Sequence, residues 1–173
     1  MSDRLLAVLL AGLAGAAVVV FTRFPRGLST AAAPHGILSF ELPRTSARAA
    51  AMTEAWRRED KLADVERSLR IDRLFIPLYV ATLAVFGVLA ARAADAHDVL
   101  AGDDAELAGT ALVAAACAAG ALDVLENLGM RRILDGHVGA RVAALTTLVA
   151  ALKWLLASLT ALYAACLLGR AWL

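Results

Sequence analysis

The apolar positions of this chain fall into long blocks, and its polar residues gather between the blocks rather than alternating with them. The four blocks run over about 5–22, 74–91, 107–129 and 142–169. Each comes close to the roughly 20 residues that an α-helix needs to cross a bilayer. Because a chain in lipid must satisfy its backbone hydrogen bonds internally, all four are expected to be helical. The pattern therefore predicts an all-α, four-helix transmembrane bundle, with residues 1–173 forming a single integral membrane domain.

The first block has a second interpretation, as a secretory signal. Ala14, Gly15 and Ala16 have the small-x-small form of a signal-peptide cleavage site. The apolar run continues past this site and stops at Arg23 and Arg26, as in a stop-transfer segment. This continuation favours an uncleaved first span.

The composition supports the same class of protein. Of the 173 residues, 61% are apolar and 19% are charged, and the formal net charge is +1. A disordered tail, a coiled coil or a nucleic-acid-binding protein needs more charge or a surplus of one sign. We therefore expect the lipid bilayer as a partner and no nucleic acid.

Lysine and arginine gather in two of the predicted loops. Residues 23–73 hold ten of the seventeen, and residues 130–141 hold Arg131 and Arg132 as well as Arg141. The loop between these two, residues 92–106, contains one arginine and five acidic residues. Because basic loops remain in the cytoplasm, loops 23–73 and 130–141 are expected on the cytoplasmic side of the inner membrane, with both termini outside.

The long first loop is expected to contain a helix of its own. From residue 46 to 71 apolar residues recur at helical spacing among many charges, and Trp56 is placed to lie at a membrane interface. One interpretation is an amphipathic helix on the cytoplasmic membrane surface. The other is a solvated helix packed on the end of the bundle.

The third span carries three polar residues on one helical face. Asp123, Glu126 and Asn127 stand at positions i, i+3 and i+4, and the face continues through the small residues Gly120 and Ala116. Charge at such depth in a membrane is costly unless it is paired, protonated or hydrated. Intramembrane ionisable residues of this kind often mark functional sites.

Lys153 is the matching residue of the fourth span, near the predicted bilayer midplane. It shares a small and polar stripe with Thr146, Ala150, Ala157, Thr160 and Ala164. The lysine is therefore expected to face the bundle, where Asp123 or Glu126 is its predicted partner.

The second span and the first loop add three candidates. Asp72 and Tyr79 are seven residues apart and so share a helical face, although the role that the sequence favours for Asp72 alone is that of a helix cap. Glu41 belongs to a short apolar stretch that ends at Pro43. Together these residues predict a polar pocket open to the cytoplasm. The alternative is that the charged side chains serve only to hold neighbouring helices together. The predicted catalytic residues are Asp123, Lys153 and Glu126, and the predicted ligand-binding residues are Asn127, Glu41, Asp72, Tyr79, Trp56 and Arg131.

No metal site or resident cofactor is expected, because the three histidines lie in loops without ligand spacing. A weaker alternative is Mg²⁺ held with a diphosphate head group by the Asp-x-x-Glu face beside Arg131 and Arg132. Cys117 and Cys166 fall inside spans and are expected to be small packing residues.

Several short segments of the chain are similar to those of an uncharacterised group of small bacterial four-span inner-membrane proteins. They are the run 39–42, the run 72–75 followed by Tyr79, the Leu-Asp-x-x-Glu-Asn run at 122–127, and a lysine in the last span. The resemblance implies the four-span fold and the same selection of polar residues. It implies no particular activity.

Three classes of function follow, and the sequence leaves open whether the protein is an enzyme. The first is binding or conversion of a lipid-like or isoprenoid-like molecule in the polar pocket. The second is an accessory or structural subunit, with Ala- and Gly-rich faces that dock on a homodimer or another membrane protein. The third is a small transporter, for which the outer halves of the spans offer few polar residues.

Overall fold

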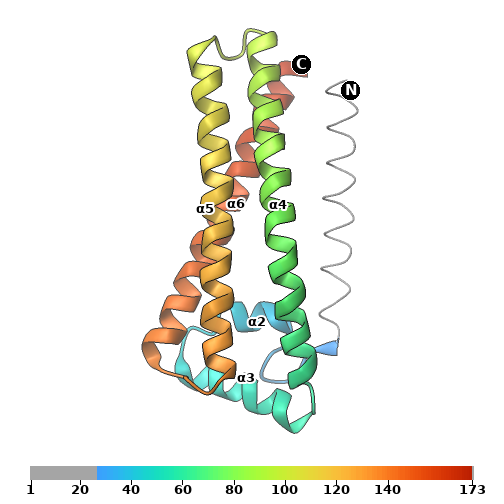
Figure 1. The fold of residues 1–173 in the computed structure, drawn as a ribbon, viewed down its shortest axis with the longest axis vertical. Coiled ribbons are helices and arrows are strands. Elements are labelled where there is room, and N and C mark those ends of the chain that lie inside the picture. Colours follow the sequence, from blue (N-terminus) through green and yellow to red (C-terminus); the bar gives the residue numbers. More distant parts are fainter. Residues whose placement is uncertain (1–26, 173) are drawn as a thin grey trace. The chain divides into compact units, whose positions relative to one another are not determined.

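A computed structural model describes residues 27–172, and in this range the regular structure is helical, without strands. Its helices, labelled in Figure 1, are α2 (Ile37–Glu41), α3 (Ser46–Arg58), α4 (Leu62–Ala96), α5 (Asp103–Leu134) and α6 (Ala140–Trp172). The all-α prediction is confirmed for these residues. The first predicted span, 5–22, lies outside the described residues.

The three long helices coincide with the second, third and fourth apolar blocks, and each is long and apolar enough to cross a membrane. All three extend beyond their apolar blocks. α4, for example, begins at Leu62 rather than Leu74 and so includes a charged segment. An apolar block marks the part of a helix that suits lipid, whereas the helix itself continues where polar side chains meet water.

The predicted helix over 46–71 is interrupted, which corrects the sequence-based boundary. Asp60 has a φ of 54° between α3 and α4, a conformation that aspartate tolerates better than most residues. The Lys61 N–H donates to the Trp56 carbonyl over 2.8 Å, closing the end of α3 as in other helix C-terminal turns. The chain thus turns at 59–61, and α3 and α4 run in different directions (Figure 1).

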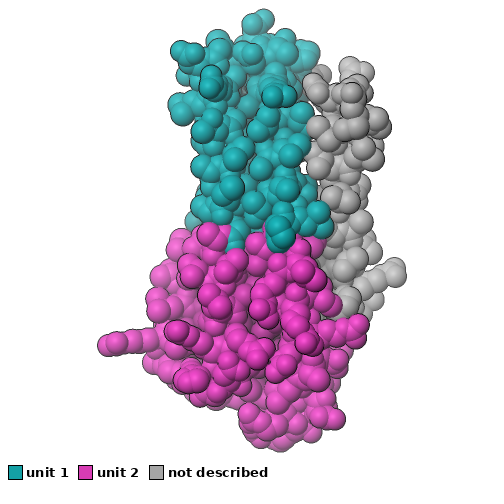
Figure 2. All heavy atoms as spheres, in the orientation of Figure 1, with its two compact units in different colours: residues 1–16, 77–120, 153–173 teal, residues 17–76, 121–152 magenta. Residues whose placement is uncertain are grey.

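The described chain forms two compact units, coloured separately in Figure 2. Unit 1 comprises residues 77–120 and 153–172 of the described range, and its interior consists mainly of small side chains. α4 and α5 approach closely there, since a Cβ added to Gly87 would lie 2.7 Å from the Cβ of Leu112. Small residues permit such approach between helices in lipid.

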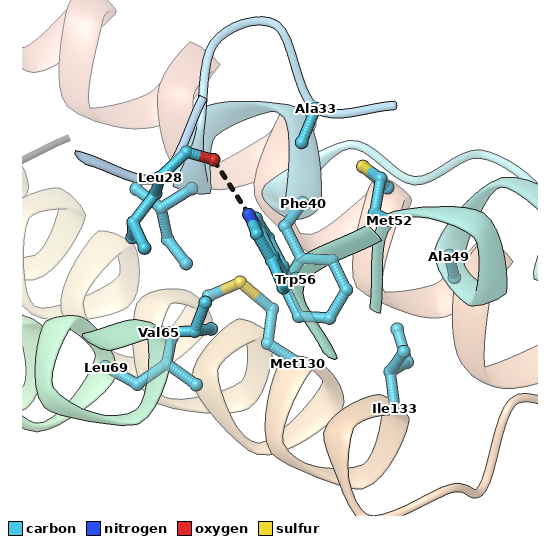
Figure 3. Close-up of a cluster of buried hydrophobic side chains, with 11 residues drawn as sticks. Leu28, Ala33, Phe40, Ala49, Met52, Trp56, Val65, Leu69, Met130 and Ile133 are labelled. Carbon is cyan, nitrogen blue, oxygen red and sulfur yellow. Dashed lines mark hydrogen bonds between the residues drawn. The ribbon is translucent and has the colours of Figure 1, made fainter. Parts of the chain in front are cut away.

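Unit 2 comprises residues 27–76 and 121–152 of the described range and has large side chains in its core. Figure 3 shows this core, which we call the aromatic cluster. Its members are Leu28, Ala33, Ile37, Phe40, Ala49, Met52, Trp56, Val65, Leu69, Met130 and Ile133. The cluster joins α2 and α3 to the beginning of α4 and the end of α5.

The packing of α3 distinguishes the two interpretations of this segment. Its apolar face, which includes Met52 and Trp56, is buried in the aromatic cluster (Figure 3). The Trp56 indole N–H donates to the carbonyl of Leu28 over 2.7 Å. Trp56 is therefore a core residue and not, as predicted, an interfacial one, and the structure favours a helix packed on the ends of α4 and α5.

Candidate functional site

The inward face of α5 in unit 2 is polar, while its outward face is apolar. Asp123, Glu126 and Asn127 are 4%, 0% and 5% exposed. Leu125 and Leu128 on the other side are 55% and 56% exposed. This arrangement reverses that of a helix in water, and it suits a helix with lipid outside and polar side chains within.

Asp72 of α4 meets this polar face. The Asn127 amide donates from Nδ2 to Asp72 Oδ2, and the same nitrogen lies 3.2 Å from the carbonyl oxygen of Asp123 and 3.4 Å from its Oδ1. We call Asp72, Asp123, Glu126 and Asn127 the polar cluster. Because α4 begins at Leu62, Asp72 lies well inside the helix, and the prediction that it caps this helix is wrong.

The polar cluster follows the aromatic cluster along both helices. On α4, Leu69 of the aromatic cluster stands three residues before Asp72. On α5, Met130 of the aromatic cluster stands three residues after Asn127. Residues three or four apart share a helical face, so in unit 2 the same faces of α4 and α5 change from apolar to polar within one turn.

Glu41 is buried at the end of α2, with 5% of its surface exposed. Its neighbour Phe40 packs edge-on against Trp56, with 5.0 Å between the ring centroids. Three residues on, the Arg44 N–H donates to Thr147 Oγ1 of α6 over 2.8 Å. The segment 40–44 is thus held between the aromatic cluster and α6, which buries the Glu41 carboxylate inside unit 2.

α5 and α6 make a close approach beside the polar cluster. A Cβ added to Gly129 would clash with Thr146 Oγ1. That hydroxyl donates to the Val142 carbonyl over 2.8 Å, and Thr146 is 3% exposed. Gly129 was missed at the sequence level, although a small residue three positions after Glu126 is the signal of a close helix neighbour.

Two predicted site residues belong to unit 1. Lys153 is 7% exposed, and its Nζ lies 5.1 Å from the centroid of the adjacent Trp154 ring. The stripe predicted around it is buried at Thr146, Ala150, Lys153, Thr160 and Ala164. Tyr79 is partly buried on α4. The pairing of Lys153 with Asp123 or Glu126, and the contribution of Tyr79, stay predictions.

The remaining two predicted ligand-binding residues have other contacts. The Trp56 indole N–H binds the Leu28 carbonyl, as described above. Arg131 is exposed at the end of α5, and its Nε lies 3.3 Å from Asp135 Oδ1. For both side chains, the role of a ligand-binding residue stays a prediction.

Among residues 27–172, no three His, Cys, Asp or Glu side chains are placed to hold a metal ion. Magnesium held by fewer carboxylates together with a diphosphate stays a prediction. Cys117 and Cys166 are exposed, so their predicted role in packing is wrong. Ala116 and Gly120 are buried, as expected of small residues on a packed face.

Comparison with known proteins found no matching family model, no similar curated protein and no similar solved structure. The function is therefore inferred from the residues and their geometry.

Proposed function

We propose that the protein binds a lipid-like molecule in the membrane, with the molecule's polar head at the polar cluster of unit 2. The observation that carries this proposal is the burial of Asp123, Glu126 and Asn127 on one face of α5, with Asp72 bonded to Asn127. Burying a carboxylate opposes folding unless another interaction compensates for the lost hydration. Binding of a ligand to these carboxylates would explain why a membrane protein contains them despite this cost.

The chemistry of the polar cluster favours a head group that donates hydrogen bonds. Carboxylates are acceptors when ionised. Asn127 Oδ1 is also an acceptor, and it is buried without a hydrogen-bond donor among the described residues. A hydroxyl or an amine of the ligand would satisfy this oxygen, because an unsatisfied buried acceptor is unfavourable.

The depth of the polar cluster suits an amphiphile. Asn127 and Asp123 precede the exposed Arg132 by five and nine residues, which corresponds to about 7.5 and 13.5 Å along a helix. If Arg132 lies at the level of the lipid phosphates, the polar cluster lies in the part of the hydrocarbon region that is nearest to the head groups. The positive charge of the surrounding loops favours the cytoplasmic leaflet for this end of the protein.

The alternative, an accessory subunit, has less support. It rests on Ala- and Gly-rich faces that would dock on another protein. In the structure Ala116, Ala119 and Gly120 are buried inside the chain itself, so this face is already occupied. The proposal of a transporter gains no specific observation from the described residues.

The test is to identify the lipids that copurify with the protein in a mild detergent, by native mass spectrometry and lipid extraction. Three proteins are compared: the wild type, Asp123→Asn, and the control Asp135→Asn, which changes an exposed acid at the end of α5. We expect one lipid class near one molecule per chain on the wild type and the control. The amount on folded Asp123→Asn should fall about tenfold or more.

Equal amounts of the same lipid on all three proteins would contradict the proposal, and so would a wild type without bound lipid. A folded wild type that instead carries a stoichiometric protein would favour the accessory subunit.

A further inference from the structure

In unit 2, each of the three long helices carries an exposed arginine close to an exposed leucine. Each helix has one exposed arginine that stands four residues from an exposed leucine: Arg70 and Leu74 on α4, Leu128 and Arg132 on α5, and Arg141 and Leu145 on α6. Four residues are about one turn, or 6 Å, so each pair lies on one helical face.

The leucines mark surface that suits lipid. Leu74, Leu128 and Leu145 are 77%, 56% and 60% exposed, and on α6 the exposed row continues to Leu148 and Leu152. A soluble protein rarely exposes continuous apolar surface of this kind. Within a membrane-spanning helix the same row contacts acyl chains.

The arginines mark the end of that apolar surface. Arg70 lies nearer the start of α4 than Leu74, Arg132 lies nearer the end of α5 than Leu128, and Arg141 lies nearer the start of α6 than Leu145. We call Arg70, Arg132 and Arg141 the arginine girdle. All three belong to unit 2. Arg132 and Arg141 lie within the last and first turns of their helices, and Arg70 lies two turns into α4, where its charged first segment gives way to the apolar block. We infer that this level corresponds to the phosphates of a membrane.

We propose that the arginine girdle binds the phosphate groups of anionic lipids. None of its three guanidinium groups forms an ion pair with another described residue, whereas Arg57, Lys61 and Arg131 of the same unit each pair with an acid. A guanidinium presents a planar fork of donors that matches a phosphate. The inference rests on membrane embedding and is independent of the polar cluster.

The test measures the thermal unfolding of the full chain in a neutral detergent with added phosphatidylglycerol or phosphatidylcholine. The girdle variant carries Arg70→Gln, Arg132→Gln and Arg141→Gln. The matched control carries Arg92→Gln and Arg170→Gln, which are exposed arginines of unit 1. Purified protein in detergent avoids any effect of the substitutions on membrane orientation.

We expect phosphatidylglycerol to raise the unfolding midpoint of the wild type and the control more than phosphatidylcholine does. The midpoint of the girdle variant should respond equally to both lipids, with apparent affinity for phosphatidylglycerol about tenfold or more below that of the wild type. High salt should weaken the wild-type response.

Equal responses of the girdle variant and the control would overturn the proposal. So would an effect of inorganic phosphate as large as that of phosphatidylglycerol, because the binding would then not depend on a lipid. The variant Asp123→Asn should keep the full phosphatidylglycerol response, which separates this surface from the polar cluster.

Discussion

Units 1 and 2 are built from the same three long helices, yet their interiors differ. The apolar cluster of unit 1 contains Ala90, Ala94 and Ala164 with two leucines. That of unit 2 contains Trp56 and Phe40 together with nine further residues. The buried carboxylates of the described chain are also confined to unit 2.

This difference shows how the surroundings of a helix determine its packing. Between helices in lipid there is little hydrophobic gain, so close approach of small residues supplies the contacts. Unit 2 includes α2, α3 and the connecting loops, and its aromatic cluster resembles the core of a protein folded in water. Large side chains there hold α2 and α3 against the helix ends, and the polar cluster lies next to them.

The largest expected effect comes from emptying the aromatic cluster. Trp56→Ala should lower the free energy of unfolding by about 3–5 kcal/mol, because it removes a fully buried ring and its hydrogen bond. Trp56→Phe keeps most of the ring but loses the hydrogen bond to Leu28, so this variant should lower the free energy of unfolding by about 1 kcal/mol. Denaturant unfolding in detergent measures both. Equal losses for the two variants would mean that packing around Trp56 matters little.

A smaller loss is expected where α5 and α6 approach each other. Gly129→Ala places a methyl group against Thr146, whose hydroxyl is already bonded to a helix carbonyl, and overpacking should cost about 2–3 kcal/mol. Gly169→Ala is the control, because nothing lies within 4 Å of its added Cβ. The control should unfold like the wild type or be slightly more stable. A stable Gly129→Ala protein would contradict the close approach.

The hydrogen bond inside the polar cluster should contribute less. Asn127→Ala removes the donor to Asp72 and should lower the free energy of unfolding by about 2 kcal/mol, because the carboxylate loses a buried partner. The double variant Asp72→Leu with Asn127→Leu should recover most of the loss. If the double variant is less stable than Asn127→Ala, Asp72 and Asn127 are needed by the fold rather than by a ligand.

The smallest expected effect concerns the pairing of Asp123 with Lys153, which the sequence predicts. A double-mutant cycle with Asp123→Asn and Lys153→Met should give a coupling free energy of about 1 kcal/mol. The control cycle combines Asp135→Asn with Lys153→Met and should give a value near zero. Equal values in both cycles would show that the two residues do not interact directly.

The long helices and the inward direction of the polar stripe could be predicted from sequence because both follow helical spacing. The break between α3 and α4 could not, since it depends on a left-handed aspartate without a glycine or proline to signal it. The position of Trp56 was wrong for a different reason: an amphipathic pattern is the same whether its apolar face meets lipid or protein. Likewise, the spacing brought Asp123 and Asn127 together, but the bond from Asn127 to Asp72 depends on the relative register of α4 and α5, which no local pattern contains.

The most direct test of the central claim compares the thermal unfolding midpoints of wild type and Glu126→Gln after delipidation, with and without the lipid recovered from the wild type. Lipid that binds only the folded protein raises its midpoint. We expect the two delipidated proteins to unfold together and added lipid to stabilise the wild type much more than the variant. A lower midpoint for delipidated Glu126→Gln, with equal stabilisation of both proteins by lipid, would contradict the claim that the polar cluster serves a ligand.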